Sequence, residues 1–274
     1  MEFRDNNDYQ PSKICWAHID YGDSNCRVSA QNRFCEHCKP GDYTCQLNCP
    51  TYSRCKHTFE VGGFPNRFWD IPANIQSPPE DYTSLITLSA IRRDILGFVN
   101  CGQNITIHSN VVSSGKTFQA CLFAQTYIFR QSNTNYHTGL AYYVYLPSWI
   151  AKYDIYDKLQ KDDERRIVFY DSLDQLSKAD LVIWDGLGFN SGSRLEDLVI
   201  RAIIQSRLND KFSNIFIPYG NLSDFNSYLV ESDLTRIRDN SIEIELSGMS
   251  FSAHQRDDYI MKVNDSITKL SRER

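Results

Sequence analysis

Short apolar runs alternate along this chain with longer segments in which apolar residues recur at helical spacing. The runs that predict β-strands cover residues 104–109, 141–146, 179–185, 214–219 and 241–246. The segments that predict helices cover residues 84–100, 117–130, 147–159, 173–177, 194–209, 223–229 and 252–270, with residues 234–238 in or near another. Strands that alternate with helices favour a parallel sheet covered by helices. The pattern therefore predicts an α/β fold for residues 81–274.

The N-terminal part of the chain lacks this periodicity. Residues 1–60 contain few aliphatic side chains, too few to bury the apolar surface that an ordered domain needs. Residues 61–80 are rich in glycine and proline, which predicts an irregular connector. Within the connector, we expect Phe64, Phe68 and Trp69 to anchor it to the second domain.

Composition narrows the class of protein. The chain has 274 residues, of which 41% are hydrophobic and 23% charged, and its net charge is −5. This balance excludes a protein that coats nucleic acid through overall positive charge, so any DNA contact has to come from a local patch. The N-terminus is polar and no apolar run approaches the length of a membrane span. We therefore expect a cytoplasmic protein with no membrane partner.

Cysteines are concentrated at the N-terminus, where seven of the nine lie within the first 55 residues. In a reducing compartment, dense cysteines indicate a metal site rather than disulfide bonds. Cys35 and Cys38 form one close pair, and Cys45 and Cys49 form another. Two such pairs suit a tetrahedral Zn²⁺, whose binding would supply folding free energy to residues 1–60.

Other ligand sets remain open for this domain. Further thiolate and imidazole ligands are found at Cys15, His18, Cys26, Cys55 and His57. Because four thiolates hold an iron–sulfur cluster equally well, such a cluster is the alternative to zinc.

A candidate phosphate-binding loop follows the first predicted strand. The loop ends in Ser114-Gly115-Lys116-Thr117, and Phe118 opens the helical segment. Strand, loop and helix in this order direct backbone N–H groups at phosphates, while the lysine reaches the outer phosphates and the hydroxyl binds Mg²⁺. Asn110 stands where the motif has its first glycine, and we expect it to adopt the left-handed backbone there.

Two polar residues follow later strands of the predicted sheet. Asp185 ends the apolar run 179–185, which reads as a central strand. An acid at the carboxyl end of such a strand lies where ligands bind in open α/β sheets, so we expect Asp185 beside Thr117, holding the metal through water. Asn221 follows the run 214–219, which we expect to neighbour the strand of Asp185.

Several motifs occur in a characteristic order. They are Gly63-Phe-Pro-Asn-Arg-Phe68, Gly115-Lys-Thr-Phe118, Tyr145-Leu-Pro-Ser-Trp-Ile150, Val182-Ile-Trp-Asp-Gly-Leu-Gly188, Tyr219-Gly-Asn-Leu222 and Leu234-Thr-Arg-Ile237. Through them, residues 61–252 resemble the AAA+ ATPase domain of replicative helicase loaders of the DnaC/DnaI type and their IstB-like transposon relatives. The resemblance implies a three-layer P-loop (AAA+) sheet, preceded in DnaI-type proteins by a cysteine-rich zinc domain that contacts the helicase.

The resemblance also implies roles for individual residues. Lys116 would bind the β- and γ-phosphates, Thr117 the Mg²⁺, and Asp185 would be the metal-binding acid. Asn221 would sense the γ-phosphate, and Arg236 would reach the nucleotide of a neighbouring subunit, with Arg238 as the competing candidate. The implied partners are a replicative DNA helicase, single-stranded DNA and further copies of this chain, which would associate through the ATPase domain.

The chain departs from that family at three positions. Gly186 replaces the second acid after the strand, Ser252 stands in place of an arginine, and Asn110 replaces a loop glycine. Because the missing acid would orient the attacking water, we expect ATP to be bound but hydrolysed slowly or not at all. The alternatives are an ATP-dependent transposition regulator that binds duplex DNA and a catalytically dead AAA+ scaffold.

Overall fold

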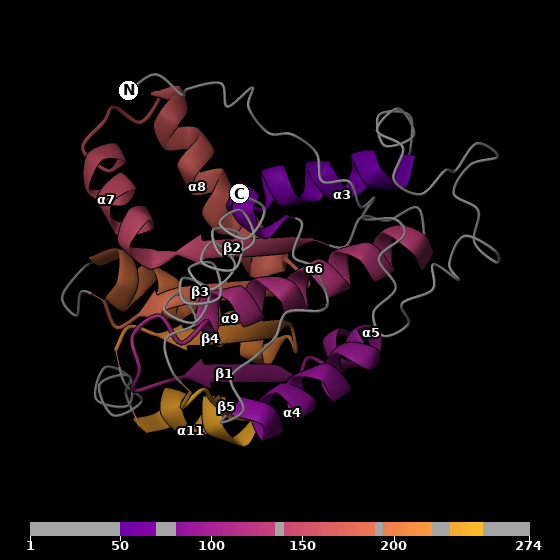
Figure 1. Ribbon diagram of the computed structural model, residues 1–274. Helices are drawn as coiled ribbons and strands as arrows, with labels where there is room; N and C mark the ends of the chain where they lie inside the picture. The colour runs from indigo at the N-terminus through magenta and orange to yellow at the C-terminus, as the bar shows by residue number, and fades with distance from the viewer. Residues whose placement is uncertain (1–49, 70–80, 135–139, 190–193, 221–230, 249–274) are drawn as a thin grey trace, which may run out of the picture.

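A computed structural model describes residues 50–69, 81–134, 140–189, 194–220 and 231–248 (Figure 1). Five strands form one sheet in the order β2-β3-β4-β1-β5. They are β1 (Asn104–His108), β2 (Ala141–Tyr145), β3 (Leu181–Leu187), β4 (Ser213–Pro218) and β5 (Ser241–Glu245). Every neighbouring pair is parallel, which confirms the predicted parallel α/β sheet.

Helices cover both faces of the sheet. One face carries α3 (Pro50–Val61), α4 (Tyr82–Arg93), α5 (Ile95–Asn100) and α6 (Lys116–Thr134), with the short 3₁₀ turn η2 (Asn66–Phe68). The other carries α7 (Leu146–Tyr156), α8 (Glu164–Lys178), the π-helical turn η4 (Leu195–Ile200), α9 (Arg201–Asn209) and α11 (Glu231–Asp239). Figure 1 shows α6 crossing one face of the sheet near α3 and α4. None of the helices in these described ranges is long and apolar enough to cross a membrane.

The strand β3 lies in the middle of this arrangement and is buried at every position. Its side chains alternate between the two faces: Ile183 packs in the core on the α6 side, whereas Val182 and Trp184 pack in the core on the α7 side. By the same alternation, Asp185 faces the α6 side, where the helix after the candidate phosphate-binding loop begins.

The helix α3 was not predicted from the sequence. Cys55 and Phe59 on α3 are fully buried in the same core as α6, although the expected division assigned residues 50–60 to the N-terminal domain. The α/β unit therefore includes residues from Pro50 onward. Residues 1–49, with the rest of the expected cysteine-rich domain, lie outside the described ranges.

The connector is anchored as expected. Phe64, Phe68 and Trp69 are all buried in the core on the α6 side, and the indole N–H of Trp69 donates to the carbonyl oxygen of Phe64 at 2.7 Å. These rings fix the segment between α3 and the end of η2 against the sheet.

Two helical predictions differ from the structure in extent. The segment 84–100 forms two helices, α4 and α5, which meet at Asp94 in a non-helical conformation with φ −118°. The segment 173–177 is the end of the longer helix α8, which begins after Asp163, whose carboxylate accepts a hydrogen bond from the backbone N–H of Arg165. The first turns of α8 were missed because their apolar residues Ile167 and Val168 are exposed and give no one-sided pattern.

A buried cation joins the amino-terminal ends of the strands. Arg207 on α9 is fully buried, and its guanidinium donates to the carbonyl oxygens of Leu176, Ala179 and Ser213 at 2.6–2.7 Å. It also donates to Oδ1 of Asn214 at 2.8 Å. These hydrogen bonds compensate for the loss of hydration, because buried polar groups without partners are strongly destabilising.

Candidate functional site

The loop between β1 and α6 presents its polar residues at the carboxyl end of the sheet. Gly115 has φ 93° and Ser113 has φ 60°, so the chain makes two left-handed steps before Lys116 begins α6. The amide of Gln119 donates to the carbonyl oxygen of Gly115 at 2.9 Å, which forms the first turn of the helix. The expectation for Asn110 was wrong: Ser113 adopts the left-handed backbone instead, because the sharp turn lies directly before the helix.

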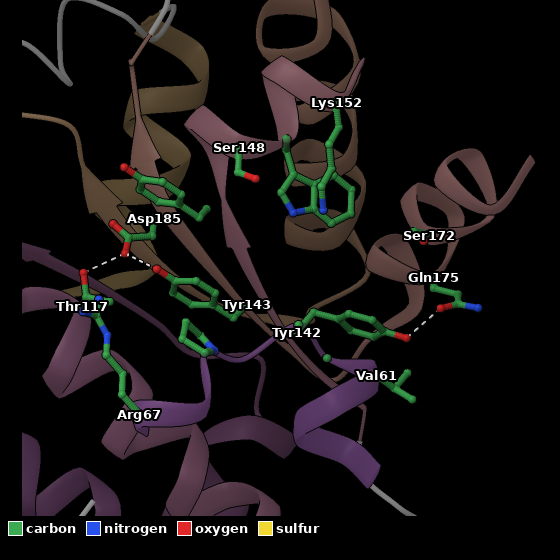
Figure 2. Close-up of a pocket in the computed structure, with 15 residues that line it drawn as sticks. Val61, Arg67, Thr117, Tyr142, Tyr143, Ser148, Lys152, Ser172, Gln175 and Asp185 are labelled. Atoms are coloured by element: carbon green, nitrogen blue, oxygen red, sulfur yellow. Dashed lines mark hydrogen bonds between the residues drawn. The ribbon is translucent and has the colours of Figure 1, made fainter. Parts of the chain in front are cut away.

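Two side chains from separate elements donate hydrogen bonds to Asp185. Thr117 donates its hydroxyl hydrogen to Oδ2 of Asp185 at 2.7 Å, although the two residues are 68 positions apart in the chain. Tyr143 of β2 donates its hydroxyl hydrogen to the same oxygen, also at 2.7 Å. Figure 2 shows both hydrogen bonds converging on the carboxylate. Two donors on one oxygen hold the carboxylate in a single orientation.

The sheet topology explains why these residues meet. Asp185 pairs in register with Tyr145 of β2 and with Ile217 of β4, and β4 in turn lies beside β1. Because all strands run in the same direction, the loop after β1 and the end of β3 emerge at the same edge. Tyr143 lies two residues before Tyr145 and therefore on the same face as Asp185.

Burial and charge act in opposite directions at this site. Asp185 is 8% exposed, and burial raises the pKa of its carboxyl group above the usual value. The hydrogen bonds from Thr117 and Tyr143 and the positive charge of Lys116 partly offset that rise in the pKa of Asp185. Burial lowers the pKa of Lys116, while the charge of Asp185 acts to raise it. Additional positive charge here would favour the ionised carboxylate.

The residues around Asp185 suit a phosphate ligand with a divalent cation. Lys116 supplies an ammonium group, Thr117 a hydroxyl, and Asp185 a carboxylate of the kind that Mg²⁺ prefers. Ser114 lies in the loop with a buried hydroxyl oxygen that has no hydrogen-bond partner among the described residues. An unsatisfied buried polar atom in such a loop is consistent with a polar ligand. Phe118, in contrast, packs its ring against the hydrophobic core.

A cavity of about 650 Å³ opens beside Asp185. Its lining comes from the connector, from strands β2 and β3 and from helices α6, α7 and α8. It includes Gly62, Arg67, Thr117, Tyr142, Tyr143, Trp149, Lys152, Gln175 and Asp185 (Figure 2). Sequence reasoning missed Tyr143 and Arg67. The alternation of β2 could have pointed to Tyr143, whereas no short-range signal indicates that the connector passes this close to the site.

The position after Asp185 offers no second acid. Gly186 has φ 88°, a left-handed conformation that side chains rarely adopt. A Cβ atom at this position would lie 3.1 Å from Cδ of Pro147, at the start of α7. The backbone here is therefore suited to glycine rather than to a glutamate or aspartate.

The remaining predicted residues lie apart from this cluster or outside the described ranges. Arg236 is exposed on α11 and donates to Oδ1 of Asn209 at 3.2 Å, and Arg238 is exposed in the same last turn. Asn221 and the four predicted zinc ligands, Cys35, Cys38, Cys45 and Cys49, lie outside the described ranges, as do the alternatives Cys15, His18 and Cys26.

The other alternative ligands, Cys55 and His57, are described. Cys55 is buried in the core, whereas His57 is exposed two residues later on the same helix. Residues two apart on a helix do not face each other, so these two cannot form a close ligand pair. Among the described residues, no group of three or more His, Cys, Asp or Glu side chains is arranged to hold a metal ion.

Comparison with known proteins was made at the level of sequence and of structure. No protein-family model and no curated protein matches the chain. A solved structure of the DnaC helicase loader has a TM-score of 0.49 and 16% identity, over 66% of this chain and 99% of that one. A structure of DnaI has a TM-score of 0.46 and 18% identity, over 68% of this chain and 93% of that one. AMPPCP-bound DnaA from Aquifex aeolicus has a TM-score of 0.46 and 14% identity, over 64% of this chain and 49% of that one.

The solved structures to which this chain is similar include the DnaC helicase loader and DnaI.

Proposed function

We propose that this chain binds ATP with Mg²⁺ at the loop before α6 and hydrolyses it slowly or not at all. The observation that carries the proposal is the 2.7 Å hydrogen bond between Thr117 and Asp185, with Lys116 at the start of the same helix. A hydroxyl, a carboxylate and an ammonium group arranged in this way match the metal and outer-phosphate positions of a phosphate-binding loop. Ser114 and Gly115 would contribute the loop that surrounds the phosphates.

Each residue has a defined part in this proposal. Lys116 would neutralise the outer phosphates, Thr117 would bind the metal ion, and Asp185 would hold it through water. The bound Mg²⁺ would supply charge neutralisation at the phosphates. Tyr143 cannot replace the missing acid, because burial raises the pKa of its hydroxyl group and the hydroxyl already donates to Asp185. Slow turnover follows from the lack of a base that could orient water.

We further propose that the ATP-bound form is a helicase loader. Copies of the chain would assemble through their ATPase domains, with Arg236 reaching the nucleotide of a neighbour and Asn221 sensing the γ-phosphate. The assembly would deliver a replicative DNA helicase to single-stranded DNA, and a zinc domain held by Cys35, Cys38, Cys45 and Cys49 would contact the helicase. Support comes from the motif resemblance over residues 61–252 and from the exposure of Arg236 on α11.

Titration of a fluorescent ATP analogue with Mg²⁺ tests the first part. We expect saturable binding by the whole chain and its loss in Lys116→Ala, with Arg93→Ala, an exposed residue on α4, as a surface control that keeps it. Turnover of ATP by the purified protein should be close to the uncatalysed rate. Unchanged binding in Lys116→Ala would refute the assigned site, and robust hydrolysis that depends on Lys116 would refute slow turnover.

Co-purification with a replicative helicase tests the second part. We expect a complex that requires residues 1–49 and a metal content near one zinc per chain, measured on the same sample. Binding of single-stranded and duplex DNA at matched salt separates the alternatives. A preference for duplex DNA, with no helicase bound in any nucleotide state, would favour a transposition regulator instead.

A further inference from the structure

The connector between α3 and η2 forms one wall of the cavity beside Asp185. It is fixed there by a hydrogen bond of 2.8 Å from the backbone N–H of Tyr143 to the carbonyl oxygen of Gly62. A Cβ atom at Gly62 would lie 2.3 Å from the carbonyl oxygen of Ala141, so the connector lies against the edge strand at its closest approach. Phe64 and Phe68 are buried on either side of Pro65. This segment is therefore held in place without any ligand.

Arg67 extends from this wall into the cavity. Its guanidinium carbon lies 4.6 Å from the centroid of the Phe68 ring, a stacked arrangement that orients the planar group. No hydrogen bond or ion pair joins Arg67 to another residue in the described part of the chain. Figure 2 shows the side chain running from η2 toward Thr117. A guanidinium that makes no hydrogen bond or ion pair with the described residues can offer its donors to a ligand.

The charge of Arg67 affects the pKa of three buried groups around it. Its positive charge lowers the pKa of Asp185, Cys121 and Tyr143, and so opposes the rise that burial produces in each. Asp185 and Tyr143 lie in the cluster that also binds Thr117, and Cys121 lies one helical turn after Thr117 on α6. The cation therefore acts on the metal end of the site, not on a remote surface.

We infer that Arg67 is a second phosphate-binding cation of this site, which binds the outermost phosphate of a nucleoside triphosphate. This inference rests on the nucleotide binding proposed above. Lys116 and Thr117 mark the end of the loop that receives the outer phosphates and the metal, and Arg67 approaches from the side of Thr117 and Asp185. A planar guanidinium can donate two parallel hydrogen bonds to a phosphate, whereas a lysine acts as a point charge.

Arg67 would then distinguish a triphosphate from a diphosphate. The terminal phosphate of ATP would join the connector to the loop before α6, and ADP would leave Arg67 without a partner.

The test compares the affinities for Mg²⁺-ATP and Mg²⁺-ADP in the full chain and its variants. We expect Arg67→Ala to weaken ATP binding roughly tenfold or more, as for a lost hydrogen bond to a charged group, while ADP affinity changes less than about twofold. Arg67→Lys should give an intermediate loss of ATP affinity, since lysine keeps the positive charge but lacks the planar guanidinium. Arg93→Ala, an exposed arginine on α4 that does not line the cavity, should leave both affinities unchanged.

The inference would be overturned if Arg67→Ala left the ratio of ATP to ADP affinity unchanged. If Lys116→Ala lost the binding of both nucleotides in the same experiment, the proposed nucleotide site would remain intact. Equal loss of ATP and ADP in Arg67→Ala would overturn it as well, since that result indicates general support of the cavity. The midpoint of thermal unfolding without nucleotide checks the fold, and we expect only a small shift in Arg67→Ala. This variant loses the contact with the Phe68 ring but no hydrogen bond or ion pair to another described residue.

Discussion

Replacement of Gly186 tests whether the backbone near the end of β3 requires glycine. Because Gly186 stands where the second acid is missing, glutamate would be the obvious substitution for restoring hydrolysis. The backbone disfavours any side chain at this position, because φ at Gly186 is 88°. An L-residue in left-handed backbone is destabilised by about 1–2 kcal/mol relative to glycine. A new Cβ atom would also lie 3.1 Å from Cδ of Pro147, closer than ordinary van der Waals contact.

We therefore expect Gly186→Ala and Gly186→Glu to be destabilised by about the same amount, since the strain arises at the backbone and at Cβ. For a domain of this size, 1–2 kcal/mol corresponds to a fall of roughly 2–8 °C in the midpoint of thermal unfolding. The assay is thermal or urea unfolding without nucleotide. Adding Pro147→Ala to Gly186→Ala should recover the stability lost through the contact with the proline ring. The stability lost through the left-handed φ should remain lost.

The refuting result is equally specific. If Gly186→Ala unfolds within about 0.5 kcal/mol of wild type, as a neutral surface substitution does, the backbone at this position is not strained by a side chain. The loss of the second acid would then be a change of side chain alone, and Gly186→Glu would be a fair test of restored hydrolysis.

Three further predictions concern the buried polar groups. Asp185→Asn should raise the thermal stability of the nucleotide-free protein near neutral pH. The raised pKa of Asp185 means that wild type loses stability as pH rises through that pKa, so the advantage of the variant should shrink as pH falls below it; a constant difference across pH in paired unfolding curves would contradict this. Tyr143→Phe removes one donor to a buried carboxylate and should lower stability by about 1.5–3 kcal/mol and weaken Mg²⁺-dependent nucleotide binding, measured by titration of the metal. Arg207→Leu leaves three buried carbonyl oxygens without a donor and should cost roughly 3 kcal/mol or more in urea unfolding, whereas the exposed Arg238→Ala should stay within about 0.5 kcal/mol.

Much of the α/β architecture could be predicted because its signals are short-range. The runs 104–109 and 241–246 begin at the same residues as β1 and β5, since an alternating apolar pattern over a few residues reports burial on one or both faces. The strand, loop and helix around Lys116 could likewise be predicted, because the spacing of residues along a single loop defines that motif. Helix α3 could not be predicted, since Cys55 and Phe59 are the only fully buried side chains among residues 54–61 and the segment has no wide apolar face.

The site itself required the tertiary structure. Thr117 and Asp185 could be expected to meet from two motifs and the general rule for parallel sheets. Tyr143 and Arg67 could not, because strand order and the path of the connector depend on contacts between distant segments.

By itself, the sequence determined which segments become strands, which loop is the candidate for phosphate binding, and which residue near the end of β3 carries the acid. Each of these depends on the order of residues over a few positions. Only the tertiary structure decided that Asp185 accepts two hydroxyl hydrogens, that Gly186 is left-handed, that Arg207 is buried among carbonyl oxygens and that Arg67 reaches the cavity. The physical reason is that burial and electrostatic environment are properties of the packed sheet and its helices, which the local pattern of residues does not specify.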